Sequence, residues 1–484
     1  MLQVQQLRER LSRWGGILLA LFVFTLPLVN PWVRGDGVGY YAYARSLLIE
    51  RHLDFEKDWQ HGNESFVMGR VGPGGRVLPS QYTSTGHIAS NWSIGPSLLW
   101  APFLLVTHVG VLLFNKMGGH VPADGFSRPY LITMAVSTSL YGFLGLWISF
   151  CLARKYFEER WAFLATLGIW WASSLPVYMY FNPSWSHAQS AFVVALFLWY
   201  WHRTRAVRTL PQWILLGLLS GLMVNVYYAN GLALLVPMME ATSSYWKAWN
   251  ASAHGGPAIA RLFVRHLVYL GVFVIALLPT LVSREIIYGS PFKTGYSPVQ
   301  DWAWHSPALW NVLFSSDHGL LSWTPILILA LVGLGRIWLV DRSFGTYLIV
   351  VFVAFYALIS LHLDWDGLSS YGNRFFVSLT LLFVLGLAAF FDWLARAVQQ
   401  WRATTMAWAG TAVLILWNLG LVYQWGTHLI PVRGPISWRE AAYNQVAVVP
   451  GQASRTVKSY LMRRGRLMQH IEEEDVKQLK SRNQ

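Results

Sequence analysis

The chain has 484 residues, of which 54% are hydrophobic, 15% aromatic and only 12% charged. Apolar runs of about 20 residues, the length of a membrane-crossing helix, recur throughout, which excludes a string of soluble domains and predicts one all-α polytopic membrane protein. The net charge of +14 fits cationic cytoplasmic loops and anionic lipid, and no basic soluble segment interleaved with aromatics indicates nucleic acid. A single cysteine, Cys151, excludes an intrachain disulfide and a cysteine-based zinc site.

The first apolar run, residues 17–33, follows a basic stretch at Arg8, Arg10 and Arg13, and no small-residue cleavage site comes after it. We therefore predict an uncleaved first transmembrane helix that begins in the cytoplasm. Further apolar segments lie near 95–114, 130–152, 161–180, 188–201, 212–227, 229–240, 264–282, 319–340, 344–362, 374–395 and 405–424.

The segment 95–114 decides the topology. If it crossed the membrane, the Lys/Arg-bearing turn at 154–160 would lie outside, against the positive-inside rule. We therefore interpret it as non-spanning, which leaves about 11 transmembrane helices and gathers the polar clusters on one external face. This count also places the tail 425–484 outside, although it carries ten Lys/Arg against five Asp/Glu; long tails follow the charge rule only weakly.

The same pattern divides the chain into two parts. A transmembrane domain covers 1–424 and contains a large first external loop, 34–129, rich in Gly, Pro, His and Tyr. The polar C-terminal tail covers 425–484. The next largest non-spanning block is 283–318.

Asp36 stands between two glycines at the exit of the first helix. A carboxylate there suits a general base, because flanking glycines let a ligand approach closely. The alternative is a solvated Asp that caps a helix beginning near Tyr40. Tyr40, Tyr43 and Leu47 at helical spacing favour the first interpretation, since they predict a helix that lies on the membrane and holds Asp36 over a cavity.

Other polar residues could contact a sugar. His87 and Asn91 precede the 95–114 segment beside Trp92, and stacking and hydrogen bonding to a sugar compete there with an aromatic belt role. His187 ends the turn 181–187 and could act as an acid, a phosphate donor or a metal ligand, although a lone histidine near a membrane surface is more often only hydrated. Without paired His or Cys, a divalent metal is compatible with the sequence but not indicated.

Cations beside aromatic residues could hold a lipid-linked phosphate, which needs charge-assisted donors. Arg284 and Lys293 lie in one loop, His318 follows Asp317 in the next, and Arg374 opens a membrane helix where it could bind a phosphate through two hydrogen bonds. The alternative is a set of ordinary cations at the headgroup level, and Arg284 could simply pair with its neighbour Glu285.

Four motifs carry a family resemblance: Gly35-Asp36-Gly37 with Tyr40-Tyr41; Gly289-Ser290-Pro291-Phe292 with Gly295-Tyr296; Leu313-Phe314-Ser315 with Gly319-Leu320-Leu321-Ser322-Trp323-Thr324-Pro325; and Tyr371-Gly372-Asn373-Arg374-Phe375-Phe376. In this order they resemble a bacterial integral-membrane glycosyltransferase of the GT-C superfamily, close to the polyprenyl-phosphate-mannose protein mannosyltransferase-like group. The motifs span 35–376, most of the chain.

The resemblance implies a GT-C-like fold with a catalytic Asp in the first external loop, facing outward from the bacterial inner membrane. The implied donor is a sugar on polyprenyl phosphate, and the acceptor is a glycan, lipid or protein of the cell envelope. Asp36 matches the catalytic carboxylate, which would deprotonate an acceptor hydroxyl in an inverting displacement.

The remaining site predictions are Arg374, Lys293, His318 and Arg284 for the donor phosphate, and Tyr40, Tyr41, Asp54, His87, Asn91, His187, Asp317 and Asp366 for the sugar or acceptor. The chain departs from the family pattern at Gly37, where many relatives have a second acid. It also has Asn182 and His187 in the second external hairpin, where relatives often have an acid.

Three other functions remain open from the sequence alone. A transporter or flippase of lipid-linked sugars would be expected to show paired halves, interrupted helices and midplane charges, whereas the charges here gather at helix ends. A transferase that uses a pyrophosphate-linked oligosaccharide is not distinguished from one that uses a monophosphate. A scaffolding membrane protein would not need its charged clusters on one side.

Overall fold

The structure is a computed structural model that describes residues 12–250 and 255–482. These residues form helices in the order α2 (Arg13–Thr25), α3 (Asp36–Arg45), α4 (Glu56–Gln60), α5 (Glu64–Val67), α6 (Gly95–Lys116), α7 (Arg128–Ala153), α8 (Glu159–Trp171), α9 (His187–Thr204), α10 (Leu210–Val226), α11 (Leu235–Asn250), α12 (Gly255–Tyr288), α13 (Leu309–Phe314), α14 (Leu320–Trp323), α15 (Ile326–Val340), α16 (Arg342–Leu361), α17 (Thr380–Ala397), α18 (Gln400–Gly426), α19 (Trp438–Tyr443), α20 (Val449–Met462) and α21 (Arg464–Arg482). Pairing between extended segments is limited, in this part of the chain, to two isolated bridges in the first external loop.

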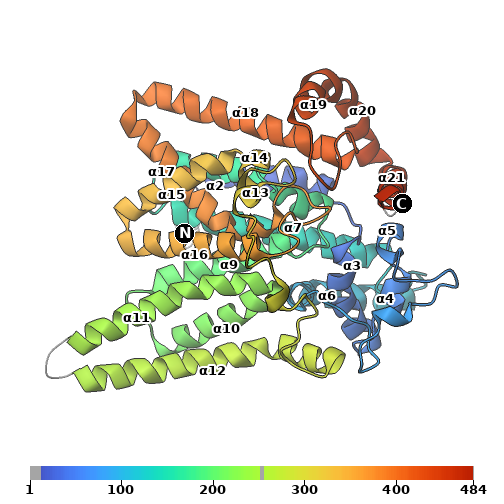
Figure 1. The fold of residues 1–484 in the computed structure, drawn as a ribbon, viewed down its shortest axis with the longest axis horizontal. Helices are drawn as coiled ribbons and strands as arrows, with labels where there is room; N and C mark the ends of the chain where they lie inside the picture. Colours follow the sequence, from blue (N-terminus) through green and yellow to red (C-terminus); the bar gives the residue numbers. More distant parts are fainter. Residues whose placement is uncertain (1–11, 251–254, 483–484) are drawn as a thin grey trace.

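Long apolar helices run between two ends of the molecule (Figure 1). Six helices among the described residues are long and apolar enough to cross a membrane, namely α6, α7, α12, α16, α18 and α17 with the short turn Arg374–Leu379 before it. Large apolar side chains such as Phe24, Val106 and Leu416 point outward, as expected where lipid is the solvent. The predicted all-α polytopic membrane fold is thus confirmed.

Contacts at the start of α2 explain the topology. Trp14 packs on Phe163 of α8 with ring centroids 4.6 Å apart, so the Arg13 end and the basic turn before α8 lie at the same end of the molecule, as the positive-inside rule requires. The helix α6 has the length of a membrane span. It runs antiparallel along the first half of α7, where its Trp100 donates to Thr138.

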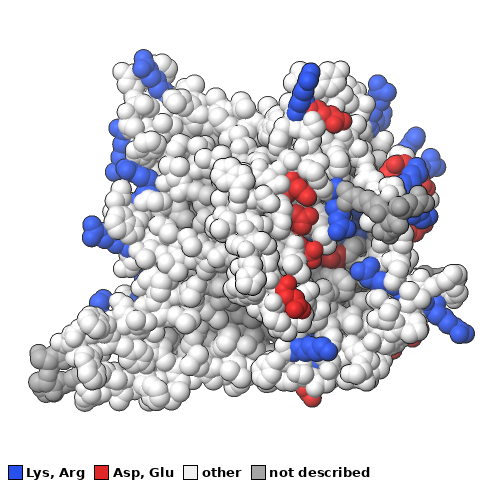
Figure 2. Space-filling view, in the orientation of Figure 1, with Lys and Arg blue, Asp and Glu red and all other residues white. Residues whose placement is uncertain are grey.

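The two ends differ in charge. In the view of Figure 2, the end that carries the α11–α12 and α17–α18 connections shows Lys and Arg without Asp or Glu, while the half that contains α3, α4, α5 and α21 shows Asp and Glu together with further Lys and Arg. We call the first the basic end and the second the site end. An excess of Lys and Arg is typical of the cytoplasmic side.

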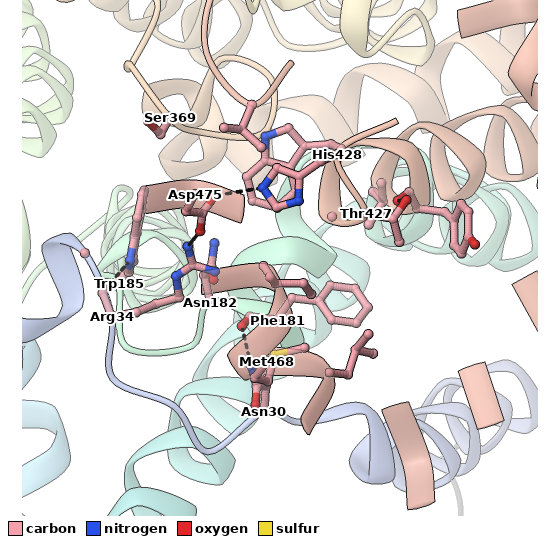
Figure 3. A pocket seen from close by; sticks show the side chains of 18 of the residues that line it. Asn30, Arg34, Phe181, Asn182, Trp185, Ser369, Thr427, His428, Met468 and Asp475 are labelled. Carbon is pink, nitrogen blue, oxygen red and sulfur yellow. Dashed lines mark hydrogen bonds and ion pairs between the residues drawn. The ribbon is translucent and has the colours of Figure 1, made fainter. Parts of the chain in front are cut away.

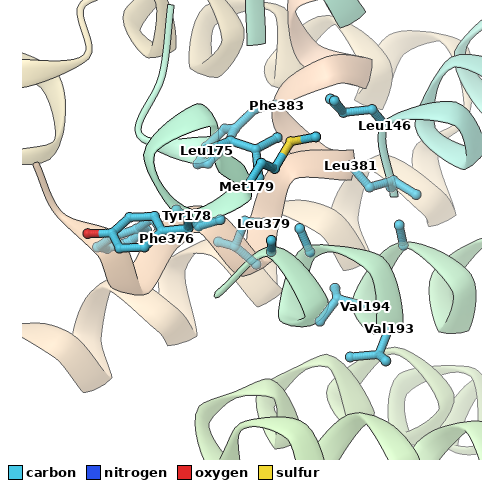
Figure 4. Close-up of a cluster of buried hydrophobic side chains, with 14 of the residues drawn as sticks. Leu146, Leu175, Tyr178, Met179, Val193, Val194, Phe376, Leu379, Leu381 and Phe383 are labelled. Atoms are coloured by element: carbon cyan, nitrogen blue, oxygen red, sulfur yellow. The ribbon is translucent and has the colours of Figure 1, made fainter. Parts of the chain in front are cut away.

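The core lies where α7, α9 and α17 meet the short helical segment Val177–Phe181 (Figure 4). Leu146, Met179, Val194, Leu379 and Leu381 in this cluster are fully buried. Since lipid tails are as apolar as these side chains, close packing rather than escape from water holds them together. The cluster anchors two turns at the site end, one before α9 and one before α17.

The helix α3 differs from its prediction in two respects. It begins at Asp36 rather than near Tyr40, and it is buried inside the protein instead of lying on the membrane. Tyr40 and Tyr43 are 4% and 0% exposed, and Ser97 of α6 donates to the Tyr40 carbonyl at 2.8 Å. The aromatic face predicted to meet lipid is covered by α6 and by the segment before it.

The C-terminal tail folds back over the first external loop as α19, α20 and α21 (Figure 1). Tyr460 donates to the Leu28 carbonyl at 2.7 Å, and Arg464 donates to the Pro27 carbonyl at 2.6 Å. The tail therefore lies at the site end, next to the segment that follows α2.

Candidate active site

Asp36 is held at the first turn of α3 by unusual backbone geometry. Gly35 has a φ of +52°, a conformation that favours glycine. Gly37 lies against Ser184 so closely that a Cβ would fall 1.9 Å from the serine Oγ. The glycines that flank Asp36 in the sequence are thus required by a strained turn and by a close approach of two segments, and they leave the carboxylate 33% exposed.

Arg374 meets Asp36 from the other half of the chain. Its Nη1 donates to Asp36 Oδ2 at 2.6 Å, and its guanidinium lies over the ring of Trp185 at 4.6 Å. Trp185 in turn donates from Nε1 to the Arg34 carbonyl at 3.0 Å. Within the described residues the buried Nε of Arg374 has no hydrogen-bond partner. One donor of Arg374, a buried one, therefore remains unpaired after the side chain has bound Asp36.

Tyrosines and a histidine pack beneath this pair. The His187 ring meets Tyr178 edge to face at 4.7 Å, and His187 is 3% exposed. Tyr296 meets Tyr228 edge to face at 6.4 Å, and burial raises the pKa of Tyr296 well above its ordinary value. This layer closes the floor of the site, so the predicted contact residues Tyr40 and His187 lie behind the surface that a substrate would meet.

A cavity of about 870 Å³ opens beside Asp36 and Arg374. Figure 3 shows part of its lining, including Arg34, Asn182 and Trp185. Its polar end includes Arg34, Asp36, Arg70, Asn182 and Arg374. Apolar side chains from three C-terminal helices form much of the remaining wall: Leu416, Leu419 and Val422 of α18, Val457 of α20, and Leu467, Met468 and Ile471 of α21. A cationic end joined to apolar walls suits an amphiphile with an anionic head.

The helix α21 also contacts the segment that carries Asp36. Arg34 forms an ion pair with Asp475, which accepts a further hydrogen bond from His428 Nε2 at 2.9 Å (Figure 3). Burial alone would raise the pKa of Asp475, but the hydrogen bond from His428 and the charge of Arg34 outweigh it and lower that pKa below its ordinary value. No sequence signal pointed to this arrangement, since the tail reads only as a polar, basic segment.

The predicted phosphate ligands separate in the structure. Arg374 lines the cavity, whereas Lys293 is exposed and lies over the Tyr288 ring at 5.4 Å. Arg284 is 1% exposed, and it donates to the carbonyls of Ser90 and Trp92 and to the Tyr228 hydroxyl. Its guanidinium is occupied by the protein. Arg34 and Arg70, which the sequence did not distinguish from other loop cations, take the places beside Arg374.

Several predicted sugar or acceptor ligands lie away from the cavity lining. Their contacts are local: Asp54 accepts from the backbone N–H of Glu56 at the start of α4, His87 bonds Thr85, the Asn91 carbonyl accepts from Arg284, and Tyr41 donates to the Gly125 carbonyl. These residues build the walls of the first external loop. A pattern of polar and aromatic types in sequence does not distinguish such packing from ligand contact.

Asp317, His318 and Asp366 could hold a divalent cation. One ligand atom from each lies within 4.8 Å of the other two, and His318 Nδ1 is 3.6 Å from Asp317 Oδ1. Burial lowers the pKa of His318 to about 4, which keeps the imidazole in the neutral form that binds metals. The next residue, Gly367, lines the cavity. The sequence alone does not indicate this grouping, because its residues come from two loops 48 positions apart.

No family model matches the chain, and no curated protein sequence matches it. Among solved structures it is similar to ArnT from Cupriavidus metallidurans in the apo state, with 13% identity, 85% of this chain and 71% of that chain covered, and a TM-score of 0.45. It is also similar to ArnT from the same organism bound to undecaprenyl phosphate, with 13% identity, coverage of 86% and 72%, and a TM-score of 0.42.

A third similar structure is the archaeal oligosaccharyltransferase AglB from Archaeoglobus fulgidus, in complex with an inhibitory peptide and a dolichol-phosphate. The identity is 12%, the coverage is 85% of this chain and 55% of that chain, and the TM-score is 0.46. These values are too low to transfer a residue role or a substrate to this chain, so the chemistry has to follow from its own residues.

Proposed function

We propose that this protein is an integral-membrane glycosyltransferase that moves a sugar from a polyprenyl-phosphate donor to an acceptor hydroxyl. The site end then faces outward from a bacterial inner membrane. The observation that carries the proposal is the Asp36–Arg374 pair at the cationic end of an otherwise largely apolar cavity. The resemblance of the motifs around both residues to the GT-C superfamily supports it.

The cationic end suits the donor phosphate. A phosphate brought out of water needs charge-assisted hydrogen bonds, and Arg34, Arg70 and Arg374 all line this end. Arg374 offers its unpaired Nε, and its planar fork can bind a phosphate through two parallel hydrogen bonds. The apolar walls from α18, α20 and α21 provide the surface on which a polyprenyl chain can lie.

Asp36 acts as the general base. Its carboxylate takes the proton of the acceptor hydroxyl while the hydroxyl oxygen attacks the anomeric carbon. The bond from that carbon to the phosphate oxygen breaks, the electron pair stays on the phosphate, and the anomeric configuration inverts. Arg374 orients the carboxylate before the reaction and stabilises the charge that develops on the departing phosphate. Asp36 then releases its proton to water.

The first experiment supplies purified protein with radiolabelled polyprenyl-phosphate and polyprenyl-pyrophosphate sugars in detergent, together with lipid, glycan and peptide acceptors. We expect wild type to consume a monophosphate donor and Asp36→Asn to leave it intact. Asp364→Asn is the matched control, because Asp364 is an exposed acid in the loop before Arg374 and does not line the cavity.

Two outcomes would overturn the proposal. Turnover by Asp36→Asn at the wild-type rate would remove Asp36 from the mechanism. Labelled lipid that crosses a reconstituted bilayer without being consumed would instead indicate a transporter. Consumption of pyrophosphate donors alone would correct the donor class and leave the transferase reaction standing.

A further inference from the structure

The helix α21 touches the catalytic turn at two separate points, both through buried acids. Glu472 and Asp475 are 7% and 9% exposed. They lie three positions apart and therefore share one face of the helix. Carboxylates are seldom buried unless they are paired, and both of these have partners in the first external loop.

The first contact joins Asp475 to the residue two positions before Asp36. The Arg34 guanidinium lies over the Trp32 ring at 4.6 Å and forms an ion pair with Asp475. His428, which follows α18, donates to the other carboxylate oxygen. Asp475 thus links the residues just after α18 to the backbone segment that carries Asp36, the proposed general base.

The second contact reaches the turn through one side chain. Glu472 Oε1 accepts hydrogen bonds from Asn63 Nδ2 and from the Ser65 backbone N–H, both at 2.7 Å. Asn63 Oδ1 in turn accepts from the Gly35 backbone N–H at 2.9 Å. One acid of α21 therefore orients the amide that holds the residue immediately before Asp36.

The same face of α21 forms part of the cavity wall. Leu467, Met468 and Ile471 line the cavity together with Asp36, and Met468 Sδ lies 3.3 Å from Asn30 Nδ2 (Figure 3). Because a glycine backbone offers many conformations, the turn at Gly35 needs contacts from outside to keep one of them. The helix supplies those contacts and a surface for the substrate at once.

We propose that α21 is a working part of the active site, in which Asp475 and Glu472 are positioning residues for Asp36 and the apolar side chains are a wall for the lipid part of the substrate. The activity tests of this role rest on the proposed function. Since a displacement of a catalytic group by about 1 Å can cost about 100-fold in rate, loss of either acid reduces turnover without removing any group that touches the reacting atoms.

The activity test compares Asp475→Asn and Glu472→Gln with Glu473→Gln, whose carboxylate lies on the same helix but is 55% exposed. We expect kcat to fall between about 10- and 100-fold in the first two, with a smaller change in the donor KM, and no change in the control. Arg34→Gln with Asp475→Asn should be no slower than the slower single variant, because both remove one interaction. Two results would overturn the proposal: equal kcat in all variants, or a loss of kcat in the double variant that equals the product of the two single losses.

A tether distinguishes positioning from general stability. In a Cys151→Ser background, Asn30→Cys with Met468→Cys places two thiols where the side chains now touch. Oxidation in the Asp475→Asn protein should restore most of the kcat that the same double-cysteine protein has with Asp475 intact, and reduction should remove this gain again. Oxidised protein that is inactive even with Asp475 intact would show that α21 has to leave during the reaction, which contradicts a fixed wall.

Hydrogen exchange tests the same contacts without any substrate. Amides of α3 and of the turn before it should exchange faster in Asp475→Asn and Glu472→Gln than in wild type, while Glu473→Gln stays at the wild-type rate. Unchanged exchange would overturn the positioning role. If wild type turns over no donor, the proposed function fails, and this measurement still decides whether α21 holds the turn.

Discussion

Each end of the molecule holds an arginine–carboxylate pair of similar geometry, and only one of them forms a site. At the basic end, Arg205 contacts Asp341 at 2.5 Å, and Asp341 also accepts from Tyr156 and from the Phe344 backbone N–H. At the site end, Arg374 contacts Asp36 at 2.6 Å. The distances are nearly equal, so an ion pair by itself does not identify a catalytic centre.

What differs is the surroundings of the two pairs. Asp341 caps the first turn of α16 and joins three segments of the bundle, which is a structural role. Asp36 caps no backbone amide through its side chain in the described structure, lines a cavity, and faces an arginine with a spare donor. Spare hydrogen-bonding capacity at a cavity, rather than charge pairing, separates a chemical site from a structural one.

The largest expected effect is on turnover when Asp36 is changed. Asp36→Asn removes the base and should lower kcat by at least about 100-fold while the protein still binds the lipid donor. Asp341→Asn is the counterpart at the basic end and should lower the thermal unfolding temperature without this loss of kcat. Rates from purified protein and melting curves in detergent check both. If Asp341→Asn reduced turnover as strongly, the two pairs would not differ in role.

Arg374 offers the next largest effect. Arg374→Lys keeps the charge but loses the planar fork, so the donor KM should rise by about 10- to 100-fold, as expected for loss of a charge-assisted hydrogen bond of about 1.5–3 kcal/mol. The acceptor KM should change much less. The two KM values are compared by titrating each substrate at saturating levels of the other. An equal rise in both KM values would count against Arg374 as a ligand of the donor phosphate.

Gly37→Ala tests the close packing of the site end. The added methyl group would overlap Ser184, and overpacking of this kind costs about 1–3 kcal/mol. We expect a lower melting temperature together with reduced activity. Adding Ser184→Gly should recover most of both, because it removes the atoms nearest to the new Cβ. No recovery in the double variant would contradict the clash as the cause.

The smallest expected effect is a dependence of stability on pH. The pKa of Asp475 is lower in the folded protein than its ordinary value, so the stability it contributes is present above about pH 4 and is lost as the pH falls through its folded pKa. The difference in melting temperature between wild type and Asp475→Asn should therefore narrow as the pH falls from 6 to about 3. A difference in melting temperature that widens toward acid pH would contradict a lowered pKa of Asp475 in the folded protein.

The sequence predicted the class of fold, and it named both side chains of the central pair, Asp36 and Arg374, as site candidates. Apolar runs identify membrane helices locally, and the glycines beside Asp36 mark a special turn. The prediction for α3 failed because its aromatic face meets α6 instead of lipid, and both partners are apolar in sequence. Arg284 matched the pattern of a phosphate ligand, yet its guanidinium donates hydrogen bonds to backbone carbonyls of the protein itself.

The sequence by itself therefore determined that the protein is embedded in a membrane, that it is helical, and that the two ends of the molecule differ in charge. These properties follow from the local composition of each segment. Only the tertiary structure decided which groups meet. Asp36 and Arg374 are 338 positions apart, and Arg34 and Asp475 are 441 apart. A carboxylate in a loop carries no local sign of its distant partner, since that partner is selected by the packing of the helices between them.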